Sequence, residues 1–131
     1  MIRKLFITSL IWAVLILIVC AIPGGSLPTS RFLNIPYFDK IVHACLYFPL
    51  ALILGAEFDL SNKRALQLAG PWFTLLITGF YGGMIEILQE YAFVSRSGDI
   101  MDFLSDCIGS LAGLAVYYLF CRPFFKKISK S

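Results

Sequence analysis

The sequence predicts an all-α membrane protein, a bundle of four transmembrane helices with both termini in the cytoplasm. Of its 131 residues, 59% are hydrophobic and only 15% are charged, and the mean hydropathy is +0.81. Soluble domains contain roughly 45–50% apolar residues, so a soluble chain of this length could not bury so many apolar side chains. The length allows one domain, residues 1–131.

Four apolar stretches supply the expected spans, at about residues 4–22, 39–57, 69–93 and 99–121. A helix needs about 20 residues to cross the hydrocarbon core of a bilayer. The uncharged runs behind the first and third spans, Leu5–Ile22 and Ala65–Ile85, qualify alone. The second and fourth spans qualify only if they include the charged residues at their N-terminal ends. The sequence therefore places charge inside two of the spanning helices.

The first span resembles a signal peptide in one respect, because Arg3 and Lys4 precede its apolar stretch. It is long for that role, and no small-x-small cleavage pattern follows it, so we expect a retained helix. The four cysteines lie in or at the ends of the spans without a paired metal-binding spacing, which predicts buried free thiols. They are Cys20, Cys45, Cys107 and Cys121.

The basic residues predict the orientation. If the N-terminus is inside, eight basic residues fall on the inner side and three, Arg31, Lys40 and Arg96, on the outer side. This asymmetry follows the positive-inside rule and places both termini in the cytoplasm. The lysine-rich C-terminal segment then lies beside anionic lipid headgroups, and a nucleic-acid partner is not expected.

The acidic residues follow a different pattern. Six of the eight map to the outer loops or outer ends of spans two to four: Asp39, Glu86, Glu90, Asp99, Asp102 and Asp106. The single histidine, His43, is expected at the same level. At 1.5 Å per residue, His43, Asp106 and Glu86 lie about 6, 10 and 12 Å inside their helices. Three helices thus bring ionisable groups to a similar depth.

Helical spacing places these groups on one stripe of each helix. The stripes are Asp39, His43 and Tyr47; Gly79, Gly83, Glu86 and Glu90; and Asp99, Asp102, Asp106, Gly109 and Gly113. The glycines continue the polar stripes deeper into the bilayer, where small residues let neighbouring helices approach closely. We therefore expect each stripe to face the other helices.

Structural roles account for some of these residues. Asp39 and Asp99 can cap the second and fourth helices, with Asp102 in the first turn of the fourth. Arg96 can pair with an acid at the rim, where Glu90 is expected to be solvated. His43 can also be an interhelical hydrogen-bonding residue. A charged residue at the bilayer centre costs roughly 2.5–3.5 kcal/mol. Glu86 and Asp106 therefore indicate a hydrated cleft, protonation or a bound cation.

Residues 36–115 resemble the VanZ-like family of small bacterial membrane proteins. Three blocks carry the resemblance: Asp39-Lys40-x-x-His43-x-x-x-Tyr47, then Gly83-x-x-Glu86-x-x-Gln89, then Arg96-x-x-Asp99-x-x-Asp102-x-x-x-Asp106-x-x-Gly109-x-x-x-Gly113. The family usually has asparagine where this chain has Asp106, so that residue's role does not transfer directly. The resemblance implies a multi-pass protein of the bacterial cytoplasmic membrane. It also implies an association with resistance to the glycopeptide teicoplanin, which is not carried over to this chain by default.

Two classes of function fit these residues. The first is an envelope protein whose outward-facing polar cleft binds membrane lipids or an amphiphile, such as a lipid-linked glycan or a glycopeptide. Arg96, Arg31 and Lys40 would then meet phosphate or carboxylate groups, and the remaining polar side chains would bind hydroxyls. The candidate ligand-binding residues are Asp39, Lys40, Tyr47, Gln89, Arg96 and Asp99.

The alternative is an intramembrane enzyme acting on a lipid-linked substrate. His43 or Glu86 would act as a general base, and Asp102 or Asp106 as a second acid or a cation ligand. No organic cofactor is expected, but Mg²⁺ or Mn²⁺ could bind there. A transporter fits less well, since the acids stop halfway across and Gly79–Gly83 offers no polar route. The sequence indicates no oligomeric state.

Overall fold

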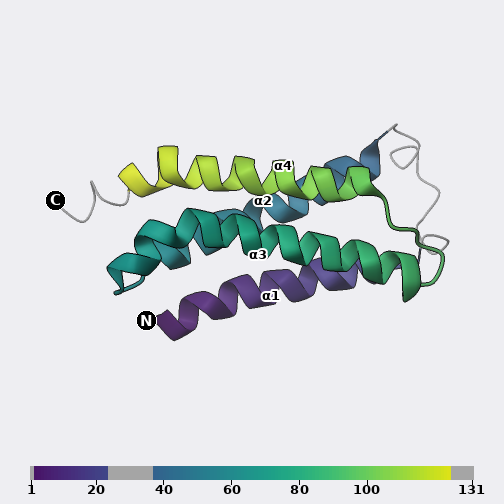
Figure 1. Ribbon diagram of the computed structural model, residues 1–131, viewed down its shortest axis with the longest axis horizontal. Helices are drawn as coiled ribbons and strands as arrows, with labels where there is room; N and C mark the ends of the chain where they lie inside the picture. The colour runs from purple at the N-terminus through teal and green to yellow at the C-terminus, as the bar shows by residue number, and fades with distance from the viewer. Residues whose placement is uncertain (1, 24–36, 125–131) are drawn as a thin grey trace.

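The computed structural model describes residues 2–23 and 37–124, and within these ranges the chain is all-helical. The elements are α1 (Ile2–Ala21), α2 (Phe38–Asp59), α3 (Arg64–Tyr91), α4 (Ile100–Val116) and the π-helical η3 (Tyr117–Cys121), which continues α4. Figure 1 shows one bundle in which successive helices run in opposite directions. α1 and α4 lie on opposite sides, with α2 and α3 between them.

Three helices of the described chain are long and apolar enough to cross a membrane: Phe38–Asp59, Arg64–Tyr91 and Ile100–Phe124. The corresponding apolar part of α1, Ile7–Ala21, is shorter. The predicted all-α class is therefore confirmed, and three helices have the length and apolar composition expected of spans. The span of α1 and the orientation of the termini stay predictions.

The bundle has an apolar exterior and a partly polar interior. Large apolar side chains such as Leu10, Trp72 and Phe80 are exposed on the outer faces of the helices, where lipid would surround them. The buried polar residues come from all four helices: Ser9, His43, Glu57, Thr74, Thr78, Gln89, Asp102, Asp106 and Ser110. The bundle therefore encloses polar groups that the bilayer would otherwise leave without hydrogen-bonding partners.

Two glycines of α4 explain why α4 packs most closely against α2. A Cβ atom at Gly109 would overlap the backbone carbonyl of Ala44, and one at Gly113 would overlap that of Phe48. Only a residue without a side chain allows the two backbones to approach this closely. The predicted role of both glycines is confirmed.

The predicted face of α3 was wrong. A Cβ atom at Gly79 would meet nothing within 4 Å, and one at Gly83 would meet only the Phe103 ring, at 3.8 Å. The buried face instead contains Gly70, Thr74, Thr78, Gly82, Ile85 and Gln89. α3 carries apolar residues around most of its circumference, so its polar end alone did not fix the orientation of its middle.

α1 is joined to the other helices by side chains that donate to backbone carbonyls. Trp12 Nε1 donates to Leu46 O at 2.8 Å, Tyr81 OH donates to Ala13 O, and Gln89 Nε2 donates to Cys20 O at 3.3 Å. Apolar contacts of Ile16 and Cys20 with α2 and α3 complete this packing. In each hydrogen bond the acceptor belongs to the main chain.

Candidate functional site

The N-terminal ends of α2 and α4 meet the C-terminal end of α3 at one end of the bundle, which we call the His43 end. His43 from α2, Glu86 from α3 and Asp106 from α4 converge there, and we call these three residues the buried triad. His43 Nδ1 lies 3.0 Å from Asp106 Oδ1 and 3.8 Å from Glu86 Oε1. The three side chains are 3%, 11% and 0% exposed, respectively. The residues that the sequence placed at similar depth are thus within reach of one another.

Two carboxylate oxygens of the triad accept no hydrogen bond from the residues that the structure describes. Glu86 Oε2 accepts from the backbone N–H of Asp99 at 2.8 Å, which fixes this carboxylate and leaves Oε1 unpartnered. Asp106 Oδ2 is also without a partner, and it lies against Gly82 of α3. Buried polar atoms in proteins are nearly always hydrogen-bonded. The triad can therefore accept further hydrogen bonds.

Lys40 is engaged by two acids beside the triad. Its Nζ lies 2.7 Å from Asp99 Oδ2 and 3.1 Å from Asp102 Oδ1. Asp99 caps α4 as predicted, since its side chain accepts from Met101 N at 2.9 Å. The hydrogen-bonded Lys40 ammonium holds the pKa of the Asp99 carboxyl below its usual value. Lys40 thus pairs with Asp99 and Asp102, although one oxygen of Asp102 also lies within 4.8 Å of a ring nitrogen of His43.

Arg96 and Asp39 lie at the rim of the same end. Arg96 Nε donates to Ile22 O at 2.9 Å, and Arg96 Nη1 lies 3.9 Å from Asp39 Oδ1, as expected for a rim ion pair. The predicted capping role of Asp39 was wrong. The N-cap of α2 is Tyr37, with φ 64° and no side-chain cap, because the helix begins at Phe38 and places Asp39 inside the first turn.

Tyr47, Gln89 and Glu90 take different positions around the triad. Tyr47 is fully buried, and its hydroxyl has no hydrogen-bonding partner. Gln89 donates to α1 instead of facing the triad. Glu90 is exposed, as predicted, and accepts from Gly98 N at 2.9 Å. Of the candidate ligand-binding residues, Tyr47 therefore retains an unused polar group in the described structure.

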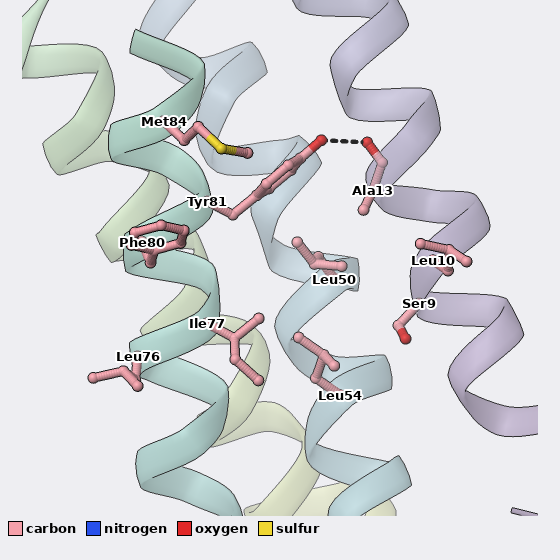
Figure 2. Close-up of a pocket in the computed structure, with 10 residues that line it drawn as sticks. All are labelled: Ser9, Leu10, Ala13, Leu50, Leu54, Leu76, Ile77, Phe80, Tyr81 and Met84. Atoms are coloured by element: carbon pink, nitrogen blue, oxygen red, sulfur yellow. Dashed lines mark hydrogen bonds between the residues drawn. The ribbon is translucent and has the colours of Figure 1, made fainter. Parts of the chain in front are cut away.

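An apolar groove of about 580 Å³ lies between α1 and α3, with Leu50 and Leu54 of α2 at its base. Figure 2 shows Ile77, Phe80 and Tyr81 of α3 on one side and Leu10 and Ala13 of α1 on the other. The Tyr81 ring lines the groove, and its centroid is 6.1 Å from that of Tyr47. Tyr81 thus joins the groove to Tyr47, which lies one turn of α2 beyond His43. No sequence pattern predicted this groove, because it depends on the gap that α1 leaves beside α3.

The opposite end of the bundle, which we call the Asp59 end, holds a second charged cluster that the sequence analysis missed. Arg122 Nη2 lies 2.8 Å from Asp59 Oδ1, and Arg122 Nε donates to Asp59 Oδ2 at 3.0 Å. Tyr117 OH donates to the same Oδ2 at 3.2 Å. Nearby in the sequence, Glu57 is buried, and its Oε1 lies 3.4 Å from the backbone N of Ser9. The spacing from Asp59 to Arg122 offered no signal because they lie on different helices.

Two further expectations need correction. The thiols are free, as predicted, but only Cys20 is buried; Cys45 is exposed, and Cys107 and Cys121 are intermediate. Polar residues also continue past the level of Gly79–Gly83, because Thr74 and Thr78 on the neighbouring face of α3 are buried. The polar interior therefore does not stop halfway along the bundle.

This fold and these clusters define a helical membrane protein whose polar groups gather inside the bundle. The chain belongs to the VanZ/LLP1 family, whose sequence model matches residues 5–121, and the predicted family resemblance is confirmed. It is 30% identical over 113 residues to an uncharacterized protein of Schizosaccharomyces pombe, C11E3.10, covering 86% of this chain and 67% of that protein. No solved structure matches the chain. Since that relative comes from a yeast, the bacterial inner membrane stays a prediction.

Proposed function

We propose that this protein binds a membrane amphiphile, with the polar headgroup at the buried triad and the hydrocarbon tail in the α1–α3 groove. The observation that carries the proposal is the pair of unpartnered carboxylate oxygens of Glu86 and Asp106 inside a membrane-spanning bundle. Acidic groups at membrane depth are expensive and usually mark functional sites. A ligand that donates hydrogen bonds to these two oxygens would offset the cost of burying them.

The hydrogen bonds of the basic residues indicate the chemistry of the headgroup. Lys40 is held by Asp99 and Asp102, and Arg96 by Ile22 O and Asp39. These side chains are therefore poor candidates for the phosphate-binding role expected from the sequence, and Arg31 lies outside the described residues. The unpartnered oxygens favour hydroxyl or amine donors, such as the sugar of a lipid-linked glycan.

The groove supports a hydrocarbon tail on the same ligand. Its volume of about 580 Å³ is within the range of roughly 300–1,000 Å³ that is usual for ligand pockets. Its lining residues are almost all apolar, and Tyr81 and Tyr47 connect it to the triad. A lipid-tailed glycopeptide belongs to this ligand class, so teicoplanin belongs among the compounds tested.

The binding proposal is tested with purified protein in lipid nanodiscs and labelled candidate ligands: a polyprenyl-linked sugar, phospholipids and teicoplanin. We expect Glu86→Gln to weaken binding of the hydroxyl-bearing ligand at least tenfold, because the amide loses a charged acceptor. Asp59→Asn at the opposite end is the matched control and should bind as the wild type does. Equal binding by wild type and Glu86→Gln for every ligand would overturn the proposal.

A blocking substitution separates the tail from the headgroup. Ile77→Trp fills the groove without touching the triad. We expect it to weaken binding of the long-tailed ligand while leaving binding of its water-soluble headgroup unchanged. If the long-tailed ligand binds Ile77→Trp as it binds the wild type, the groove has no part in binding.

The basic residues support an outward-facing His43 end, because eight of them lie on the opposite side when the N-terminus is inside. A reporter enzyme fused after Ser131 should then be active only in the cytoplasm. Activity on the outer side would place the triad at the cytoplasmic face and change the pool of available ligands.

Acid–base catalysis is a second candidate function, and one contact favours it. His43 Nδ1 and Asp106 Oδ1 are 3.0 Å apart, within the range for a positioned proton donor and acceptor, with Glu86 close by. Incubation of the protein with lipid-linked substrates tests this function. Loss of turnover in Glu86→Ala with retained lipid binding would support an enzyme, and absence of turnover with every envelope lipid would contradict it.

A further inference from the structure

We propose that the buried triad binds a single divalent transition-metal cation, Zn²⁺ or Mn²⁺, with one ligand atom each from His43, Glu86 and Asp106. The inference deepens the proposed function, since it rests on the triad being the ligand-binding site and adds an ion to it. Such cations also accept hydroxyl oxygens as ligands, so the ion and the proposed hydroxyl-bearing headgroup can share the site.

The geometry carries the first step. One nitrogen or oxygen atom from each of the three residues lies within 4.8 Å of the other two. Metal–ligand distances of about 2.0–2.2 Å put neighbouring ligand atoms about 3.0–3.5 Å apart. The two measured separations from His43 Nδ1, 3.0 Å and 3.8 Å, bracket this range. Small side-chain shifts would bring the three atoms to coordinating distance, and at least one further position would stay open for water or a ligand.

The unpartnered oxygens are an independent observation. Asp106 is 0% exposed, and its Oδ2 has no hydrogen bond. Glu86 Oε1 also lacks one, while the Asp99 N–H holds its other oxygen, in the manner of an outer-shell contact that orients a metal ligand. The triad thus presents buried ligand atoms that the described protein does not satisfy.

Charge balance supports a dication. Two carboxylates with a neutral imidazole carry a charge of −2, which one divalent cation cancels. Burying a charged group without a counter-charge is strongly unfavourable. The alternative set, Asp39, His43 and Asp102, also lies within 4.8 Å, but Asp102 already pairs with Lys40. The triad is therefore the better site of the two, and because both need His43 only one can be occupied.

The ligand types predict which cation binds. Imidazole nitrogen favours Zn²⁺ and other transition metals, and carboxylates favour Mn²⁺. Mg²⁺ prefers oxygen ligands and keeps most of its waters, which a buried site with a histidine does not accommodate well. We therefore expect Zn²⁺ and Mn²⁺ to bind more tightly than Mg²⁺ or Ca²⁺.

The test uses full-length protein in detergent, stripped with EDTA and titrated with ZnCl₂ or MnCl₂. Calorimetry and the Mn²⁺ electron paramagnetic resonance signal should report one cation per chain. We expect His43→Gln, Glu86→Gln and Asp106→Asn each to weaken binding 10-fold or more, consistent with loss of a ligand. Glu90→Gln and Asp59→Asn are the acidic controls and should bind as the wild type does. Circular dichroism and gel filtration identify any variant that fails to fold.

The possible results distinguish the cation inference from the proposed binding of an amphiphile. If no stoichiometric cation binds, or if Glu86→Gln binds it as tightly as the wild type, the cation inference fails. If lipid binding still depends on Glu86 in EDTA, the proposed amphiphile function stands without the metal. If the cation binds at the triad but no amphiphile does, the cation inference stands and the proposed function fails.

Discussion

Asp59 and Asp106, near opposite ends of the bundle, differ in how fully their oxygens are engaged. The contrast holds for these two residues and not for the two ends as a whole, since the buried Glu57 also has an oxygen, Oε2, without a partner among the described residues. At the Asp59 end, both oxygens of Asp59 are engaged, by Arg122 and by the Tyr117 hydroxyl. At the His43 end, Asp106 has one oxygen near His43 and the other without a partner. The first arrangement is complete within the protein, as expected of a structural contact. The second is incomplete, as expected of a site that accepts a ligand.

The largest predicted effect comes from the helix contact that holds the His43 end together. Gly109→Ala would force a methyl group into the Ala44 carbonyl and push α4 away from α2, separating Asp106 from His43. Overpacking typically costs roughly 1–3 kcal/mol and occasionally more, and here the clash is with backbone atoms that cannot rotate aside, so we expect a cost of about 3 kcal/mol or more. We expect a lower unfolding temperature in detergent together with weaker ligand binding.

Gly79→Ala is the matched control, since a Cβ atom there meets nothing within 4 Å. Within a helix it should be neutral, or stabilising by about 0.5–1 kcal/mol, because alanine is the better helix former. If the two variants unfold at the same temperature, α2 and α4 are not held by close backbone approach.

The next effect tests the two carboxylates directly by measuring the free energy of unfolding in EDTA. Asp59→Asn should lower it by about 1.5–3 kcal/mol, because it weakens hydrogen bonds to a charged partner. Asp106→Asn should leave it unchanged or raise it, since it removes a buried charge that lacks a full set of partners. A larger loss of stability in Asp106→Asn than in Asp59→Asn would reverse the assignment of the two ends.

Two tyrosines allow the same comparison with a smaller expected change in the free energy of unfolding. The Tyr117 hydroxyl donates to Asp59, whereas the Tyr47 hydroxyl is buried without a partner. Tyr117→Phe should lower the free energy of unfolding by about 0.5–1.5 kcal/mol, and Tyr47→Phe should not lower it. Chemical denaturation of the two variants measures both values. A destabilised Tyr47→Phe would show that its hydroxyl has a structural partner.

The smallest effect is a pH dependence at the rim of the His43 end. The pKa of Asp99 is held below its usual value of 3.8 by Lys40. A lowered pKa contributes stability that is present above pH 3.8 and is lost as the pH falls through the lower folded value. The effect should be small, because the side chain is 42% exposed.

Asp99→Asn removes this contribution. The unfolding temperature of the wild type should therefore fall more steeply than that of the variant as the pH is lowered below 3.8. Parallel curves would show that the Lys40–Asp99 contact does not contribute to stability.

The features that the sequence predicted are those that depend on local spacing. The helical stripes placed His43 and Asp106 on the inner faces of their helices, and the glycine pattern of α4 predicted its approach to α2. Asp99 could be recognised as a cap because its position before an apolar helix is itself the signal.

The features that the sequence did not predict depend on contacts between helices. The phase of α3 was wrong because several of its faces are apolar, so Gly82 and Thr78 could not be recognised as buried. Lys40 and Arg96 were expected to face a ligand, but their nearest partners come from other helices and loops. The Asp59–Arg122 pair and the groove likewise require the packed bundle.

The attachment of α1 has a consequence for how its sequence can change over evolution. Three of its hydrogen bonds to α2 and α3 use a main-chain carbonyl as acceptor, two of them on α1 itself at Ala13 and Cys20. A fourth runs from the backbone N–H of Ser9 to the Glu57 carboxylate. A substitution cannot remove a carbonyl acceptor, and a carbonyl oxygen can accept a second bond beside its helical one. The side chains that do hold α1 are Trp12 and Ser9, which hydrogen-bond α2, and the buried Ile16 and Cys20. The exposed side chains of α1 can therefore change in homologues while the helix keeps its place.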